Sequence, residues 1–332
     1  MTRIILDEQI PKKITISAAR DFSAALIHKL FANTPKPIRP ITEHLAKAQG
    51  KGVRTAVLLA AALDESEQVP KDTILAATAI ELFHMATLVH DDVIDEADSR
   101  RGIASIHAKF SKKEAIICGD YLFCVATSTV SSIYEPYKGF AMKFSTAVER
   151  VCLGELRQYA NNYNMNMNIQ EYLRIIHGKT AALFFISAYA GALIGGADEQ
   201  QAKKIGRIGT FLGMIFQILD DCKDYMLDES QALKPTKTDI AQGVMNLPML
   251  MALIKEPTLR IANPKDLLTI DQLVNEVYRL NGVKDAIIIV EKYAKKIHKM
   301  IDTLGNIPKQ AALQALLDSQ IQLAESFKQQ KN

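Results

Sequence analysis

Residues 88–102, LVHDDVIDEADSRRG, place a dense group of charged side chains directly after an apolar run. If that run is helical, Asp91 and Asp95 lie four residues apart on one face, with Asp92 beside them. Two carboxylates about 4 Å apart repel each other by roughly 4 kcal/mol at an effective dielectric constant of about 20. A polyvalent cation bound between the aspartates would relieve this repulsion.

Two arginines follow these aspartates, Arg100 and Arg101. A guanidinium group can bind a carboxylate or a phosphate through two parallel hydrogen bonds, so the pair suits an anion such as phosphate. The alternative is an acidic helix end that only faces water, since charge clusters mark sites with limited certainty. A second site of the same kind elsewhere in the chain would favour the metal and phosphate interpretation.

A second acidic motif stands in GMIFQILDDCKD, residues 213–224. Asp220, Asp221 and Asp224 repeat the spacing of the first motif, again at the end of a long apolar stretch. Gln217 lies three residues before Asp220, one helical turn away on the same face. One DDxxD string is a weak signal, whereas two on separate helix ends are a strong one.

Further candidates for anion binding lie outside the acidic motifs. Lys51 and Arg54 are three residues apart near an expected helix N-terminus, although a solvated basic turn is the alternative. His84 lies two turns before Asp91 on the same stripe, where a core histidine is the alternative. Lys179 and Thr180 border an uncharged run and have ordinary helix residues as their alternative.

The elements that must position these residues are helices. Nearly every segment shows a helical period and almost none shows strand alternation, which predicts an all-α fold. We expect one domain spanning residues 1–332. Residues 180–197 are uncharged, but their Ala and Gly content and the absence of flanking basic loops favour a buried helix, so we expect no transmembrane segment.

Composition narrows the class of protein. A net charge of +3, from 40 basic and 37 acidic residues, argues against a nucleic-acid partner. The four cysteines show no metal-binding spacing and are expected to be reduced core thiols of a cytoplasmic protein. No Gly-rich phosphate loop, HExxH or GxSxG motif occurs, which removes the common nucleotide, zinc-protease and hydrolase classes.

Taken together, these motifs resemble those of the trans-isoprenyl (polyprenyl) diphosphate synthases over nearly the whole chain. Residues 50–54 look like the family's GKRLRP element, residues 90–102 like its first aspartate-rich motif, and residues 213–224 like its second. The family's remaining motifs match GExxQ at residues 154–158, KT at residues 179–180 and a lysine loop at residues 234–239. The resemblance implies an isoprenoid-synthase-type helical bundle around a central cavity, usually a homodimer, with its two DDxxD helix ends facing each other.

The resemblance also assigns roles to individual residues. Mg²⁺ ions, about three per active site, would be held directly by Asp91, Asp95 and Asp220 and supported by Asp92, Asp221 and Asp224. The allylic diphosphate would contact Arg100, Lys179, Gln217 and Lys234. Isopentenyl diphosphate would contact Lys51, Arg54, His84 and Arg101.

The implied reaction is a head-to-tail condensation. Metals and cations stabilise the departing diphosphate, the allylic carbon ionises, and the isopentenyl double bond attacks it. Loss of a proton then gives a product one isoprene unit longer, which partitions into membranes. Thr180 and the carbonyl group of Lys179 would stabilise the transient cation.

Product length is expected to depend on the residues before the first motif. Ala86 and Thr87 are small where a bulky residue would stop elongation early, and Phe83 would form a floor one turn deeper, unless it is only a core residue. The family analogy therefore predicts a medium to long product of roughly six to ten isoprene units, as in heptaprenyl or octaprenyl diphosphate synthases. A short-chain farnesyl or geranylgeranyl diphosphate synthase is the alternative.

The chain departs from the family pattern at several positions. Gly52 stands in place of an arginine, and Thr55 and Ala104 in place of prolines. Residues 244–246, Val-Met-Asn, replace a Lys-x-Thr element, so one diphosphate contact is lost unless Lys237 supplies it.

Three other functions stay open at this point. A terpene cyclase would share the fold but carry a second motif with Ser and Glu in place of DDxxD. A partner subunit of a heteromeric synthase would be expected to lose aspartates that are present here, although activity could still need an accessory subunit. A Ca²⁺-binding bundle would leave the arginines and lysines unexplained.

Overall fold

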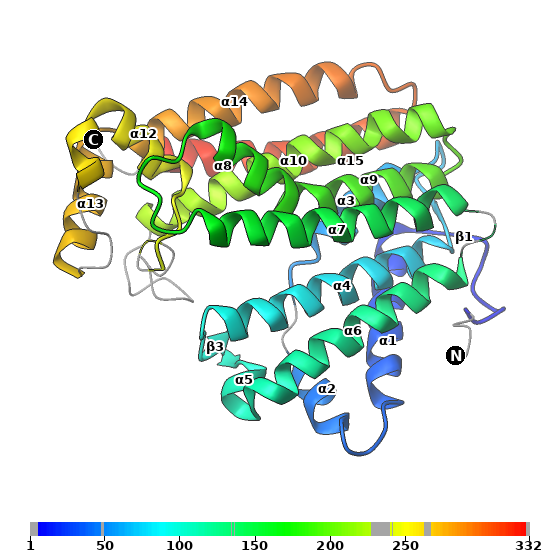
Figure 1. Ribbon diagram of the computed structural model, residues 1–332. Helices are drawn as coiled ribbons and strands as arrows, with labels where there is room; N and C mark the ends of the chain where they lie inside the picture. The colour runs from blue at the N-terminus through cyan, green and yellow to red at the C-terminus, as the bar shows by residue number, and fades with distance from the viewer. Residues whose placement is uncertain are drawn as a thin grey trace. The chain divides into compact units, whose positions relative to one another are not determined.

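The computed structural model describes residues 6–47, 50–133, 135, 137–226, 240, 242–261 and 267–329. Most of them lie in helices, so the all-α fold expected from the sequence is confirmed (Figure 1). Within this part of the chain, two antiparallel pairs of short strands accompany the helices. They are β1 (Lys13–Ile14) with β2 (Val69–Pro70), and β3 (Ser99–Arg100) with β4 (Ile103–Ala104).

The described helices follow one another along the chain in three groups. The first group is α1 (Ile16–Ala32), α2 (Arg39–Leu45), α3 (Val53–Ala62), α4 (Thr73–Ile94), α5 (Ile106–Lys109), α6 (Lys112–Ser132) and α7 (Lys138–Ala160). The next group is α8 (Ile169–Ile176), the π-helix η1 (His177–Ala181), α9 (Ala182–Ile194) and α10 (Glu199–Met226). The last group is α12 (Leu247–Lys255), the 3₁₀ helix η2 (Pro257–Ile261), α13 (Leu267–Arg279), α14 (Gly282–Ile301) and α15 (Ile307–Gln329).

The chain divides into two compact units. The first unit comprises Met1–Ser145, Ile186–Gly206 and Asn306–Lys309, and the second comprises Thr146–Phe185, Arg207–Gly305 and Gln310–Asn332. Helices α7, α9, α10 and α15 therefore contribute residues to both units. The single domain expected from the sequence stays a prediction.

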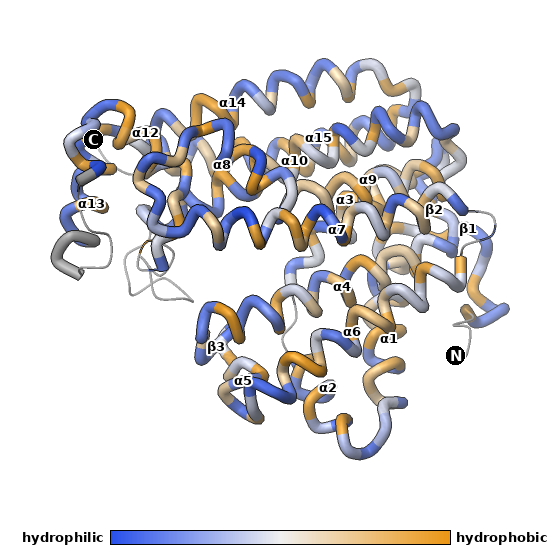
Figure 2. Tube along the Cα trace, viewed as in Figure 1, coloured by the Kyte–Doolittle hydropathy of each residue, from blue (hydrophilic) through white to orange (hydrophobic). Residues whose placement is uncertain are grey.

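Helix α4 forms the core of the first unit, where it packs along α6 and against α1 and α3 (Figure 1). It is apolar around most of its circumference, which is typical of a helix buried among others (Figure 2). Ile80 and Leu82 are fully buried, and Ala76 and Ala79 let neighbouring helices approach closely. Rigid packing of this kind fixes the position of the acidic sequence at the C-terminal end of α4.

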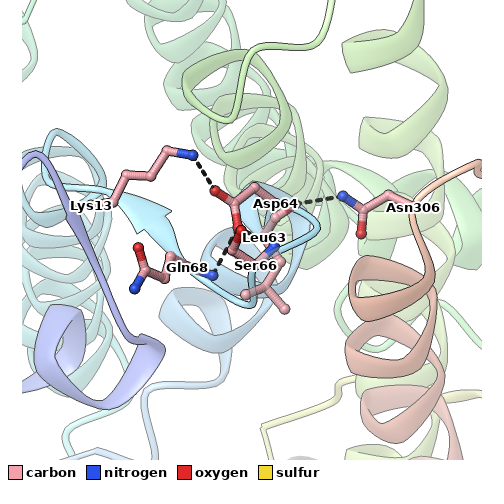
Figure 3. A network of polar contacts seen from close by, with 6 residues as sticks. All are labelled: Lys13, Leu63, Asp64, Ser66, Gln68 and Asn306. Carbon is pink, nitrogen blue, oxygen red and sulfur yellow. Dashed lines mark hydrogen bonds and ion pairs between the residues drawn. The ribbon is translucent and has the colours of Figure 1, made fainter.

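A polar network around Asp64 fixes the segment that follows α3 (Figure 3). The carboxylate accepts hydrogen bonds from Lys13 Nζ (2.5 Å) and from the backbone N–H groups of Ser66 (2.8 Å) and Gln68 (3.0 Å). The bond from Lys13 is the main reason that the pKa of Asp64 lies below its ordinary value. The network ties β1 to the end of α3 and so helps to hold the helix that begins next to Arg54.

Among the residues that the structure describes, two helices are long and apolar enough to cross a membrane when judged by length and composition alone. They are α4, with 67% of the tested window buried inside the protein, and α6, with 44% buried. A buried core helix passes the same test, so the finding is weak support for a membrane span. The run 180–197 falls into η1 and the shorter helix α9.

All four cysteines are free thiols. Cys118 and Cys222 are buried, and burial raises the pKa of Cys118 to about 12. Cys124 and Cys152 are exposed, so the expectation of core thiols is wrong for these two. They lie on the outward faces of α6 and α7, which the sequence pattern did not separate from the inward faces.

Candidate active site

The first acidic motif lies at the C-terminal end of α4, in the first unit. The helix ends at Ile94, and the backbone N–H of the capping residue Asp95 donates to the carbonyl oxygen of Asp91 at 2.8 Å. The two side chains therefore lie one turn apart on the same face, as the spacing predicts. Asp95 is exposed and Asp91 is partly exposed.

Asp92 is held differently from the aspartates on either side of it. Its side chain is buried, with 5% of the residue exposed, and it accepts a hydrogen bond from Arg100 Nε at 2.6 Å as part of an ion pair. The hairpin of β3 and β4 carries Arg100 back to the helix end. Besides its predicted role at the allylic diphosphate, Arg100 thus neutralises the buried carboxylate.

The second acidic motif, in the second unit, also has a buried middle aspartate. Asp221 is 5% exposed and accepts hydrogen bonds from Tyr172 Oη (2.6 Å) and Gln217 Nε2 (2.8 Å). Thr180 Oγ1 in turn donates to Gln217 Oε1 at 2.6 Å. Burial, followed by the charge of Asp221, keeps the pKa of Tyr172 well above its ordinary value, so the phenol remains a donor.

The outer aspartates of the second motif face solvent more than Asp221 does. The Asp220 side chain is 52% exposed and pairs with Lys223 at 2.9 Å, and Asp224 is partly exposed. Both motifs thus share one design, in which the second aspartate is buried and anchored and the first and fifth are more exposed. The anchored pair, Asp92 and Asp221, fixes the backbone from which the exposed carboxylates project.

Lys179 and Thr180 lie in a π-helical turn, where an ordinary α-helix was expected. The turn meets α7 where two glycines touch: a Cβ atom on Gly154 would lie 2.2 Å from the Lys179 nitrogen and one on Gly178 would lie 3.0 Å from the Gly154 Cα. Lys179 Nζ pairs with Glu155 Oε2 at 2.9 Å. This close approach explains the glycine of the GExxQ motif, and such single π-turns often occur at functional sites.

The resemblance implies that the two DDxxD helix ends face each other, and this depends on how the two units are placed. Asp91, Asp92 and Asp95 belong to the first unit, and Asp220, Asp221 and Asp224 to the second. That expectation stays a prediction.

Replacing Gly154 by alanine should destabilise the protein, because the new methyl group would overlap the backbone at Lys179. We expect a loss of about 1–3 kcal/mol in the free energy of unfolding, measured by urea denaturation. Gly305→Ala is the matched control, since a Cβ atom there meets nothing within 4 Å. Equal stability of both variants would contradict the packing argument.

A basic cluster lies in the first unit around His84. Arg54 Nη1 lies 3.0 Å from His84 Nε2. A guanidinium group can only donate, so Nε2 accepts and the ring proton sits on Nδ1. Burial is the largest cause of a pKa well below the ordinary value of 6.5, and the charges of Arg54, Arg101 and Arg100 lower it further. His84 is therefore a neutral hydrogen-bond donor among cations.

The N-terminus of α3 adds backbone donors to this cluster. Gly52 is the N-cap residue, with a φ of 60°, and it provides no side-chain cap to the first N–H groups of the helix. These groups, next to Arg54, are suited to an anion. The left-handed conformation accounts for glycine at a position where the family often has arginine.

A cavity of about 320 Å³ lies beside the cluster in the first unit, lined in part by Gly50, Glu81, His84 and Arg101. A Cβ atom on Gly50 would lie 2.7 Å from the Arg101 guanidinium, so glycine leaves room for that side chain. Burial lowers the pKa of Arg101, and the negative charge of Glu81 opposes that shift. Of the predicted isopentenyl diphosphate residues, His84 and Arg101 thus line one cavity, Arg54 contacts His84, and Lys51 is exposed nearby in sequence.

His84 should account for part of the decrease in the free energy of unfolding at acid pH. Because its folded pKa is depressed, the unfolded chain binds more protons, and stability contributed by the neutral ring is lost as pH falls below 6.5. The slope reaches at most about 1.4 kcal/mol per pH unit. His84→Gln should remove this component in urea denaturation measured across that range. A stability difference between wild type and variant that is independent of pH would contradict the account.

The residues predicted to control product length all lie on α4, where Phe83 and Ala86 are buried and Thr87 is partly exposed. Phe83 is 3% exposed and meets Phe123 and Phe144 edge-on, at centroid distances of 5.9 Å and 5.8 Å. Ala86 is 2% exposed, and Thr87 donates its hydroxyl hydrogen to the carbonyl oxygen of His84 at 2.8 Å. Phe83 is therefore part of an aromatic core, which is compatible with a floor but does not require one.

Some predicted residues have other positions or other partners. Lys234 and Lys237 lie outside the described residues. Asn246, where the family usually has threonine, caps α12 through the N–H of Met249 (3.2 Å) and accepts from Tyr225 Oη (2.7 Å). Its role here is structural, which accounts for an asparagine at that position.

Sequence reasoning missed Tyr172, and it gave no role to Glu81 or Glu155. Tyr172 occurs on the buried face of the amphipathic helix α8, where nothing in the sequence indicates a contact with Asp221, 49 residues away. Glu155 is part of the GExxQ motif, which was the available signal. Glu81 is a charge inside an apolar helix, which is also an unusual feature.

Fold and site together define a helical enzyme of the isoprenoid-synthase class. The family model described as polyprenyl synthetase matches residues 35–278. The chain belongs to the polyprenyl synthetase family, and it is a polyprenyl diphosphate synthase, which is a prenyltransferase. The resemblance inferred from the motifs is confirmed.

Individual proteins support this assignment. Heptaprenyl diphosphate synthase component 2 of Bacillus subtilis is 35% identical over 278 residues, which cover 82% of this chain and 79% of that protein. The crystal structure of heptaprenyl diphosphate synthase from Staphylococcus aureus is 28% identical, with a TM-score of 0.86 over 95% of this chain and 99% of that one. A polyprenyl synthase from Caulobacter crescentus, crystallised with calcium and isoprenyl diphosphate, is 25% identical, with a TM-score of 0.82 over 92% of this chain and 96% of that one.

Proposed function

We propose that this synthase makes a medium- to long-chain all-trans polyprenyl diphosphate, by Mg²⁺-dependent condensation of isopentenyl diphosphate with an allylic diphosphate. The observation that carries the proposal is the shared design of the two acidic motifs. In each, the middle aspartate is buried and anchored, while the more exposed carboxylates remain beside it. Such outward carboxylates suit metal ions that carry a diphosphate.

The donor set fits Mg²⁺ better than a metal with a full protein cage. Among the described residues, no three His, Cys, Asp or Glu side chains already converge on one point. Mg²⁺ is usually held by one or two carboxylates together with substrate phosphates and water. Asp91 and Asp95, one turn apart, and Asp220 can supply those carboxylates. When bound, the ions, about three per site, would neutralise charge on the departing diphosphate.

The protein's own residues would perform the remaining tasks. Lys179 and Gln217, with Arg100, would hold the allylic diphosphate, while Arg54, His84 and Arg101, with Lys51, would hold isopentenyl diphosphate. Thr180 lies in the π-turn, and its hydroxyl group is oriented by the hydrogen bond that it donates to Gln217. Lone pairs there would stabilise positive charge on the allylic carbon. Lys234 is also proposed as a diphosphate ligand from its motif alone.

Support for a medium or long product comes from Ala86 and from the named relatives. Ala86 is small and buried on the helix that ends in the first motif, at the position where a bulky residue would be expected to stop elongation early. The relatives from B. subtilis and S. aureus are named as heptaprenyl diphosphate synthases. Identity near 35% does not fix product length, so size must be measured.

The proposal includes a homodimer. Two neighbouring helices in the sequence expose large apolar side chains, which often mark interfaces between proteins. On α6 they are Ile116, Ile117 and Phe123, and on α7 they are Met142, Leu153, Leu156 and Tyr159. An accessory subunit is the alternative partner for this surface.

We also propose that the enzyme is cytoplasmic and that its product partitions into membranes.

The direct test of the proposal is to incubate the purified chain with Mg²⁺, labelled isopentenyl diphosphate and allylic primers of different length, and then to size the products. We expect products of roughly six to ten isoprene units. Products that stop at three or four units would indicate a short-chain synthase. Cyclic hydrocarbon products would contradict the proposal altogether.

A dependence on a second subunit is favoured by one observation. The B. subtilis relative is named component 2 of its synthase. If the chain alone fails to elongate any primer but gains activity when a second component is added, the catalytic residues are intact and the heteromeric form is correct.

A larger residue at position 86 should shorten the product. Ala86→Tyr would place an aromatic ring on the buried face of α4 before the first motif, and we expect products shorter by several isoprene units, resolved by chromatography. Phe83→Ala, one turn deeper, should lengthen products if Phe83 forms a floor. Circular dichroism must first show that both variants fold. An unchanged product from a folded Ala86→Tyr enzyme would refute the tunnel argument.

A further inference from the structure

Thr55 makes a buried contact that the motifs do not explain. It is the third residue of α3 and is 5% exposed. Its hydroxyl group donates a hydrogen bond to Glu81 Oε1 at 2.7 Å, which joins α3 to α4. The proline usual at this position in the resembled motif has no hydrogen to donate, so the contact is a property of this chain.

Glu81 places a carboxylate in the wall of the cavity that the proposed function assigns to a diphosphate. It is partly buried and lines the same cavity as His84 and Arg101, where the proposed function places the diphosphate of isopentenyl diphosphate. A carboxylate next to a bound diphosphate repels it unless the carboxylate is turned toward a cation. Arg101 lines the same cavity, and the negative charge of Glu81 favours the charged form of that arginine, which opposes the lowering of its pKa by burial.

We propose that Thr55 is a positioning residue for isopentenyl diphosphate, which acts by fixing the Glu81 carboxylate toward Arg101 and away from the bound diphosphate. The inference rests on the proposed function, because it assigns that cavity to this substrate. Thr55 does not touch the reacting atoms. Its contribution is to the orientation of a charge, and it therefore affects binding of one substrate more than turnover.

Removing the hydroxyl group should weaken binding of isopentenyl diphosphate selectively. Thr55→Val keeps the branched shape, and we expect it to raise the KM for isopentenyl diphosphate about tenfold, with kcat and the KM for the allylic diphosphate within about twofold of wild type. Thr55→Ser, which keeps the hydroxyl group, should stay close to wild type. Thr129→Val is the matched control, since it removes a buried hydroxyl group that bonds within α6.

A double-mutant cycle tests whether Thr55 acts through Glu81. In a Glu81→Gln background, Thr55→Val should raise the KM for isopentenyl diphosphate by less than about twofold, because the charge that it positions is gone. A purely structural role predicts the full tenfold effect in both backgrounds. That result, or equal effects of Thr55→Val on both substrates, would overturn the inference.

The outcome also separates this inference from the proposed function. If the wild-type enzyme elongates primers and Thr55→Val has unaltered kinetics, the inference is wrong and the proposed function stands. If the wild-type enzyme, alone or with an added second component, neither elongates primers nor binds isopentenyl diphosphate in calorimetry, both are wrong.

Discussion

Carboxylates at one helix end repel each other, and each acidic motif of this synthase needs donor groups that stabilise its buried aspartate. In the first motif the donor is a cation: Arg100 pairs with the buried Asp92. In the second motif, Tyr172 and Gln217 donate hydrogen bonds to the buried Asp221, and Lys223 pairs with the more exposed Asp220. In both motifs the buried aspartate is thus held by side chains from other segments of the chain or from the same helix, and the more exposed aspartates lie beside it.

Repulsion between like charges is limited in the basic cluster of the first unit as well. The basic cluster of the first unit has a neutral histidine between arginines, so His84 adds a hydrogen bond without adding to the repulsion among Arg54, Arg100 and Arg101. Under the proposed function, the diphosphate of isopentenyl diphosphate would bring negative charge to this cluster.

The sequence predicted most of the helices and the facing side chains within them, because helical periodicity depends only on local spacing. Asp91 and Asp95 lie on one face, and Gln217 bonds to Asp221, as residues one turn apart should. Tyr172, the π-turn at Lys179 and the exposed thiol of Cys124 were not predictable in this way. They depend on packing between segments distant in sequence, such as the glycine contact of α7 with η1. Lys234 lies outside the described residues, so its motif is the basis of its assigned role.

Under the proposed function, the exposed carboxylates form a metal site only together with a diphosphate. Isothermal titration calorimetry of the protein with Mg²⁺ alone, with inorganic diphosphate alone, and with both together tests it most directly, after subtraction of the heat of the two ligands mixed without protein. We expect saturable binding of Mg²⁺ only when diphosphate is also present, whereas diphosphate alone can bind to the basic cluster. Tight binding of Mg²⁺ in the absence of diphosphate would contradict it, because the protein would then hold the ion with its own side chains.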